Sequence, residues 1–342
     1  MKKYILIIVV FASMLPDLKA QTAGALFSEK VVRPRMRVII DNDLAGDPDG
    51  LFHLAQQLLS PSAEVRGIIG SHFTFDPAAP DKANSATLSA AKAKELLAVM
   101  HLTDKYPVYE GSNRPLKDAK TPQITEAAQF IVSEAMRTDT KLPLYVVCGA
   151  SLTNIASAFL IEPAIADKIT LVWIGGQEHE GLALPPPNHT AVEYNLNLCI
   201  HSAQVIFNRS GIMLWQVPRN AYRQCQYSYA ELLTKIKPKG ALGLFLTESL
   251  EKIMTMFARF GNMGETYILG DSPLVLLTAL QSNFEPDPSS SIYVKIPAPS
   301  IDEKGLYHDN PDGRPVRVYT HIDTRMMFED MDAKISMWNY EL

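Results

Sequence analysis

Cysteine is scarce in this sequence of 342 residues, which contains only three: Cys148, Cys199 and Cys225. An odd number this small cannot build a disulfide framework, and no two of the three form the CxxC pair typical of a zinc site. Cys148 and Cys199 lie in apolar surroundings, which predicts that they are core residues. The scarcity of cysteine therefore excludes a disulfide-stapled fold and gives no support to a zinc protein.

Basic residues are fewer than acidic residues. Lys and Arg number 32 against 37 Asp and Glu, which gives a formal net charge of −5. Removing residues 1–20 would delete three lysines and one aspartate and change the charge to −7. A chain with this balance has no electrostatic case for binding nucleic acid.

Long hydrophobic runs are absent apart from residues 4–15, which are too few for a comfortable membrane span. Two lysines before this run and small Ala20 after it predict a signal peptide, residues 1–20, cleaved before Gln21, with an uncleaved anchor as the alternative. We therefore expect an exported protein, periplasmic or secreted, with no membrane segment after cleavage. Residues 21–342 show no internal repeat or linker and are expected to form a single domain.

The chain is organised around residues 37–59. Val38, Ile39 and Ile40 predict a strand buried on both faces, and the apolar spacing over residues 51–59 predicts one face of a helix. Four aspartates lie in the turn between these two elements: Asp41, Asp43, Asp47 and Asp49. In an open α/β sheet such a turn lies at the carboxyl edge, where ligands bind.

Four carboxylates crowded into one turn repel one another unless a cation neutralises them. Oxygen ligands in this number suit Ca²⁺ or Mg²⁺, so the turn predicts a metal site. The simpler alternative is an acidic, solvated turn in which Asp47 or Asp49 caps the helix.

Further apolar strands alternate with helical segments along the chain. The strands are expected at residues 64–70, 107–109, 142–148, 169–174, 212–217, 291–296 and 316–321. The helices are expected near residues 83–100, 122–137, 152–161, 202–209, 229–260, 274–280 and 326–337. This alternation predicts an open, mostly parallel, doubly wound α/β sheet flanked by helices. Asp43, Ser71, Cys148 and Gly175 should then collect at one edge, and the aperiodic residues 177–194 form a long loop of the functional kind.

Six segments match, in order, the motifs of one enzyme family. They read DNDLAGDPDG (41–50), PVYEGSNRPL (107–116), LYVVCGASLTNIASAF (144–159), ITLVWIGG (169–176), NHTAVEYN (188–195) and GDSP (270–273). Together they resemble the inosine-uridine-preferring nucleoside hydrolases over most of the chain. The resemblance implies hydrolysis of the N-glycosidic bond of a small-molecule ribonucleoside by a calcium-bound water, on an open α/β fold.

The resemblance also implies roles for individual residues. Asp43 matches the metal ligand and general base, Asp271 matches the distal metal ligand, and Cys148 stands where a backbone carbonyl binds calcium. Three residues match those that bind the ribose hydroxyls: Asn188, Glu193 and Asn195. The chemistry agrees, because an oxocarbenium-like transition state needs anionic surroundings and a water activated by a cation and a carboxylate.

The sequence departs from the family pattern in two places. Where the family has two consecutive aspartates, this chain reads Asp47-Pro48-Asp49-Gly50, and the helix register places Gly50 at the second aspartate. One carboxylate ligand is then missing, or Asp47 or Asp49 replaces it. Gly270 stands where typical members have the histidine assigned to the leaving base.

Assistance to the leaving base must then come from elsewhere. His72, expected among the substrate-binding residues, and His179 are candidate acids at the predicted edge, since a histidine with a pKa near 6.5 can serve this role. Stacking on Phe73, Trp173 or Tyr267 is the alternative.

Other functions stay open at this point. The altered motif also allows an exported protein that binds a nucleoside or sugar without cleaving it, or a hydrolase of another N-ribosyl or glycosyl substrate. A phosphotransferase of the haloacid dehalogenase kind fits poorly, because Leu44 and Ala45 follow the second aspartate. The sequence does not report base preference or whether the chain forms a homo-oligomer.

Overall fold

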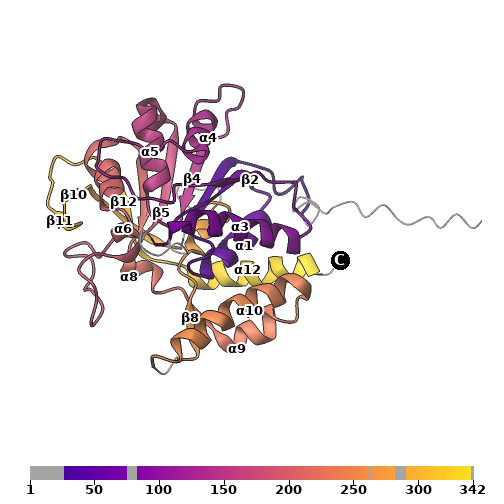
Figure 1. Cartoon of the computed structure of the whole chain (residues 1–342). Helices are drawn as coiled ribbons and strands as arrows, with labels where there is room; N and C mark the ends of the chain where they lie inside the picture. Colours follow the sequence, from indigo (N-terminus) through magenta and orange to yellow (C-terminus); the bar gives the residue numbers. More distant parts are fainter. Residues whose placement is uncertain (1–26, 75–82, 262–263, 282–289, 340–342) are drawn as a thin grey trace, which may run out of the picture.

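The computed structural model describes residues 27–74, 83–261, 264–281 and 290–339 (Figure 1). The expected signal peptide lies outside these ranges. None of the helices in the described ranges combines the length and apolarity that a membrane crossing requires.

The centre of the structure is an eight-stranded sheet with the order β3-β2-β1-β4-β5-β6-β12-β9. All neighbours pair in parallel except β9 and β12, which are antiparallel. The strands are β1 (Met36–Asn42), β2 (Ala63–Gly70), β3 (Val108–Glu110), β4 (Leu144–Cys148), β5 (Ile169–Ile174), β6 (Met213–Val217), β9 (Ile292–Pro297) and β12 (Pro315–His321). The predicted open, mostly parallel α/β sheet is confirmed.

Helices cover both faces of this sheet, because β1 is apolar on both sides. Val38 and Ile40 enter one core and Ile39 enters the other, all three fully buried. The first core is covered by α1 (Asp49–Leu58), α3 (Ser85–Val99), α10 (Gly240–Phe257), α11 (Pro273–Leu276) and α12 (Thr324–Asn339). The second is covered by α4 (Glu126–Ala135), α5 (Thr153–Ile161) and α7 (Ile200–Gln204). Figure 1 shows these two layers on opposite sides of the strands.

Shorter elements complete the fold. They are α6 (Tyr194–Asn197), α8 (Arg219–Tyr222), α9 (Tyr229–Glu231), the π-helical turns at Val205–Arg209 and Leu232–Ile236, the 3₁₀ turn at Pro163–Asp167, and the strand pairs β7 (Gln226–Ser228) with β8 (Thr266–Ile268) and β10 (Ser300–Ile301) with β11 (Tyr307–His308). Three-residue strands are too short to show a periodic pattern, which is why the β7–β8 pair was not predicted.

One predicted helix is shorter than expected. The sequence predicts a helix over residues 274–280, but α11 ends at Leu276. The backbone N–H of Leu280 donates to the carbonyl of Val275, and the hydroxyl of Thr278 donates to the carbonyl of Leu274. These bonds take up carbonyls that further helical turns would use, and the segment closes as a turn.

The carboxyl ends of four neighbouring strands meet at one edge, as predicted. In the register of the sheet, Asp41 lies beside both Ile69 and Cys148, and Cys148 lies beside Trp173. The chain leaves this edge through Ser71, whose N–H donates to the carbonyl of Asn42 at 2.8 Å. Residues far apart in sequence are therefore brought together directly above β1.

Candidate active site

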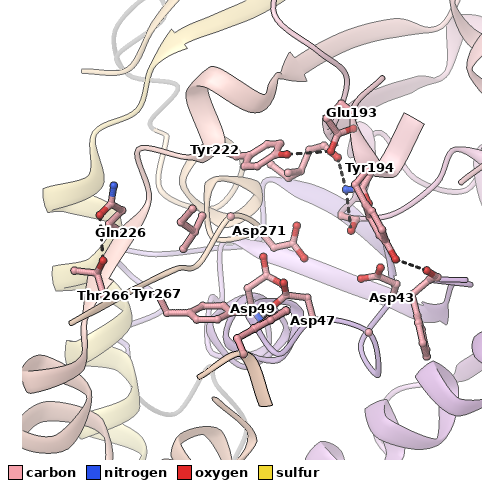
Figure 2. Close-up of a pocket in the computed structure, with 18 residues that line it drawn as sticks. Asp43, Asp47, Asp49, Glu193, Tyr194, Tyr222, Gln226, Thr266, Tyr267 and Asp271 are labelled. Carbon is pink, nitrogen blue, oxygen red and sulfur yellow. Dashed lines mark hydrogen bonds between the residues drawn. The ribbon is translucent and has the colours of Figure 1, made fainter. Parts of the chain in front are cut away.

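A cavity of about 680 Å³ opens at this carboxyl edge (Figure 2). Its walls come from the turn between β1 and α1, the segment before α11, the start of α6 and the β7–β8 pair. Six of the predicted site residues line it: Asp43, Asp47, Asp49, Glu193, Asn195 and Asp271. Figure 2 shows Asp43, Asp47, Asp49 and Asp271 facing the same space from two separate segments of the chain. Asp41, the remaining aspartate of the predicted turn, does not line the cavity, because it is fully buried and accepts hydrogen bonds from Ser71 and Asn154.

Burial raises the pKa of each of the four aspartates that line the cavity, and for three of them neighbouring acidic charges add to the shift. Burial is the main cause for Asp43 and Asp49, and the charges of Asp271 and Asp47 add to it. Burial likewise raises the pKa of Asp271, followed by the charges of Asp47 and Glu193. Among the residues that line this cavity in the described part of the chain, none is Lys, Arg or His. The cavity is therefore a buried concentration of negative charge with no basic side chain to offset it.

These residues suit a divalent cation in charge and in donor type, since carboxylate oxygens are the preferred ligands of calcium. Asp271 packs closely against Gly149, where a Cβ atom would lie 2.5 Å from either carboxylate oxygen. Glycine at this position lets the carboxylate approach the end of β4, next to Cys148. Within the described residues, no three or more His, Cys, Asp or Glu side chains form a ready-made cage for a metal. The cavity supplies the donors and the charge, and ligation requires them to converge.

Asp47 and Asp49 both lie at the start of α1, where the N-cap residue is Pro48 and makes no side-chain cap. The Oδ1 atom of Asp47 accepts from the Asp49 N–H at 3.3 Å and from the Tyr267 hydroxyl at 3.0 Å. The Oδ1 atom of Asp49 accepts from the Gly50 N–H at 2.8 Å. Both carboxylates thus bind backbone at the helix start and also face the cavity, so the capping and ligating roles are compatible.

Glu193 is held in place by the strand end and by α6. Its Oε2 atom accepts from the N–H groups of Gly176 at 2.8 Å and Leu196 at 3.1 Å, which makes it the N-cap of α6. Its Oε1 atom accepts from the hydroxyl of Tyr222 at 3.0 Å. Burial raises the pKa of this carboxyl, while its hydrogen bonds lower it. The nearby Asn195 donates through Nδ2 to the carbonyl of Ile174 at 2.9 Å.

The long loop before Glu193 is anchored by Arg219. This guanidinium donates to both carboxylate oxygens of Glu178, at 2.9 and 2.6 Å, and to the carbonyl of Thr190 at 2.9 Å. The salt bridge is largely buried, with side chains 9% and 4% exposed. Arg219 therefore fixes both ends of the loop that delivers Glu193.

Neither candidate histidine lines the cavity, contrary to expectation. His72 is fully buried; its Nδ1 atom lies 3.0 Å from the carbonyl oxygen of Ser112 and its Nε2 atom 3.3 Å from Ser151 Oγ. The Nε2 atom of His179 lies 2.8 Å from Gln216 Oε1. Burial lowers the pKa of both imidazoles. Both are satisfied neutral residues, and neither is placed to protonate a leaving base.

Three other predicted residues do not reach the cavity. Asn188 is exposed in the loop with a left-handed φ of 56° and is absent from the cavity wall. Trp173 is fully buried and donates to the carbonyl of Ala150, so it cannot stack on a ligand. The Cys148 side chain is buried away from the cavity, as expected for a residue whose implied contribution is its carbonyl. Of the predicted aromatics, Phe73 and Tyr267 do line the wall.

Sequence reasoning missed Asn42, which hydrogen-bonds to both aspartate-bearing segments, and several residues of the cavity wall. The missed wall residues are Tyr194, Tyr222, Gln226, Phe257, Thr266 and Ile268. Gln226 and Thr266 pair with each other, Thr266 Oγ1 donating to Gln226 Oε1 at 3.1 Å. A polar residue inside the β1 strand was the signal available for Asn42. Nothing local marks the others, because three-residue strands and a helix end bring them to the site.

Comparison with solved structures shows close agreement in fold. A plant nucleoside hydrolase superposes with a TM-score of 0.66 at 19% identity, over 89% of this chain and 99% of that chain. A purine-preferring ribonucleoside hydrolase from Gardnerella vaginalis gives 0.63 at 19% identity, over 89% and 99%. The inosine-uridine preferring nucleoside hydrolase from Bacillus anthracis gives 0.61 at 16% identity, over 88% and 99%.

Comparison by sequence identifies the family. No curated protein matches this chain. The family model of the inosine-uridine preferring nucleoside hydrolases, however, matches residues 38–329, from β1 into α12. This range contains every residue that lines the cavity. The chain therefore belongs to the inosine-uridine preferring nucleoside hydrolase family.

Proposed function

We propose that this N-glycosidase hydrolyses ribonucleosides to ribose and free base, with Asp43 as general base and calcium as the cofactor. The family is generally metal-dependent. The observation that carries the proposal is the gathering of four aspartates, three buried and Asp47 partly buried, on one cavity whose described wall has no basic side chain. Asp43, Asp47, Asp49 and Asp271 would hold the ion, together with the backbone carbonyl of Cys148.

A bound calcium ion supplies positive charge that lowers the pKa of water and coordination sites for vicinal hydroxyls. The protein's own groups carry the remaining steps. Asp43, which is 5% exposed, can accept the proton of the attacking water from the floor of the cavity. The anionic cluster also favours the positive charge that develops on the ribosyl group as the bond to the base breaks.

Glu193 and Asn195 are placed to orient the ribose. Glu193 is a buried carboxylate fixed by backbone donors, so a ribose hydroxyl that donates to it meets an acceptor that needs no reorganisation. Asn195 is fixed through its Nδ2 atom, which leaves Oδ1 as its acceptor for a sugar hydroxyl. Figure 2 shows both Glu193 and the aspartates bordering the same space.

The base would occupy the part of the cavity lined by aromatic side chains. Tyr222 and Tyr267 flank the aspartates, and Phe73 and Phe257 complete the apolar wall. Gly270 contributes no side chain where typical relatives have histidine. We therefore propose that the base is held by stacking on this wall.

The direct test is a reducing-sugar assay with inosine, adenosine, guanosine, uridine and cytidine, each with added calcium and after chelation. Ribose release that chelation abolishes supports the proposal and gives the base preference. No release, with calcium still raising the melting temperature, would contradict hydrolysis of these substrates and favour a protein that binds a nucleoside or sugar without cleaving it.

We also propose that the protein is exported after removal of residues 1–20 and that residues 21–342 form a single domain. The charged start, the short apolar run and Ala20 support this cleavage. The intact mass of protein recovered from the periplasm or medium tests it, since retention of residues 1–20 would exclude cleavage.

A further inference from the structure

The Asn42 side chain lies beneath the cavity and joins its two aspartate-bearing segments. It is fully buried at the end of β1. Its Oδ1 atom accepts from the Asp43 N–H at 2.7 Å, and its Nδ2 atom donates to Asp271 Oδ2 at 2.8 Å. The Asn42 amide thus links the residue that follows it with a carboxylate 229 positions after Asn42 in the chain.

A third contact fixes how this amide is turned. Asn42 Nδ2 lies 3.1 Å from Nδ1 of His53, which is also fully buried. Burial lowers the pKa of His53 to about 3, so the ring is neutral and its Nδ1 can accept the second amide hydrogen. With the two hydrogens of Nδ2 assigned to Asp271 and His53, Oδ1 is the atom that faces the N–H of Asp43.

Gly50 makes the space that this amide occupies. It is the second residue of α1 and is buried, and its backbone is not in the left-handed region. A Cβ atom there would lie 2.9 Å from Asn42 Oδ1 and 3.2 Å from both Cγ and Nδ2. Glycine is less favourable than alanine in a helix, so backbone conformation does not explain it. The close approach of the Asn42 amide does.

We propose that Asn42 is a positioning residue that takes the space of the missing side chain at position 50 and sets Asp43 and Asp271 for the cation. This rests on the proposed function for the presence of the cation. It follows that position 50 cannot supply a carboxylate while Asn42 is in place, and that the ligands from this turn are Asp43, Asp47 and Asp49.

The claim that the Asn42 amide fills the space at Gly50 is tested by a double-mutant cycle on the full chain in the presence of chelator. Gly50→Ala is expected to lower the melting temperature when Asn42 is present, because the new Cβ displaces the amide. In an Asn42→Ala background the same change should leave the melting temperature unchanged or raise it. Equal effects of Gly50→Ala in both backgrounds would overturn the claim that the amide fills this space.

The claim that Asn42 positions Asp43 and Asp271 for the cation is tested by the calcium affinity, measured by calorimetry. Asn42→Ala should raise the Kd for calcium by about tenfold or more, the range found when residues that orient metal ligands are removed. The matched control is Asn154→Ala. Asn154 is equally buried and makes as many bonds, to Asp41, Ser71 and the Ser112 N–H, but it touches none of the cavity aspartates. Its removal should destabilise the fold and change the calcium Kd by less than about twofold.

Equal calcium affinities in the two asparagine variants would overturn the positioning role. If Asn42→Ala does not fold, Gly50→Ala gives the same test, because displacing the amide should weaken calcium binding. A wild-type protein that neither binds calcium nor releases ribose would refute the proposed function instead. The cycle in chelator would still report whether Asn42 occupies the space at Gly50, so the two failures are distinguishable.

Discussion

Once calcium is removed, the free energy of unfolding of this protein should decrease as pH rises. Burial and the neighbouring acidic charges raise the pKa of Asp271 to about 8, well above the value near 3.9 of an unfolded aspartate. Between these two pH values the folded chain binds more protons than the unfolded chain. Stability is therefore highest below the unfolded pKa and falls as pH rises through the folded one.

The size of the effect follows from the same shift. Each pKa unit corresponds to about 1.4 kcal/mol, so the rise from pH 6.5 to 8 should remove about 2 kcal/mol through Asp271. This is a large part of the total of about 5–15 kcal/mol typical of a folded domain. Buried His53, whose pKa is lowered to about 3, acts in the opposite direction, but only below the pKa of about 6.5 of an unfolded histidine. The window above pH 6.5 thus isolates the carboxylates.

The assay is urea unfolding of the chelated and calcium-loaded protein at several pH values from 6.5 to 8.5. Calcium should stabilise by a margin that widens with pH, because it binds the ionised carboxylates. Asp271→Asn should flatten the pH dependence of the chelated form. A chelated protein whose free energy of unfolding is constant or increases over this window would refute the reasoning.

Four substitutions test the roles of single residues. Asp43→Asn should abolish turnover while the protein stays folded, and wild-type rates would remove it as general base. Glu193→Gln should lower kcat/KM by about 10²-fold, or about 2.7 kcal/mol, and Tyr222→Phe, which removes one donor but keeps the charge, by only about fivefold to tenfold; an unchanged kcat/KM in Glu193→Gln would exclude the contact. His179→Gln should keep kcat/KM within about twofold, because the ring lies off the cavity wall; a large loss with the alkaline limb of the pH profile gone would restore it as an acid.

Local sequence patterns predicted those parts of the fold that depend on contacts between residues close together in the chain. The continuous apolar residues of β1 and the helical spacing of α1 placed the aspartate turn at the sheet edge, because both periods are set within a few residues. The alternation of strands and helices then predicted a parallel sheet whose strand ends share one edge, since parallel strands are joined by crossover helices of one hand. The prediction that four strand ends meet above β1 is confirmed by the register.

The sequence did not predict which way the side chains just beyond the strand ends point. His72 and His179 follow strand ends just as Asp43 does, yet they turn away from the cavity into buried hydrogen bonds. A one-residue change in direction at the end of a strand moves a side chain to the other face, and long-range packing decides it. The same limit applies to Trp173, whose ring is taken up by the core.

The family, the open α/β sheet and the acidic character of the turn between β1 and α1 follow from the residue pattern alone, because short ordered motifs carry each of them. Which residues face the ligand space depends instead on how the chain packs. This packing brought the β7–β8 pair to the cavity wall, left Asn188 outside it, and joined Asn42 to Asp271. These outcomes depend on contacts between segments far apart in the chain, where burial and the filling of space at Gly50 select one arrangement.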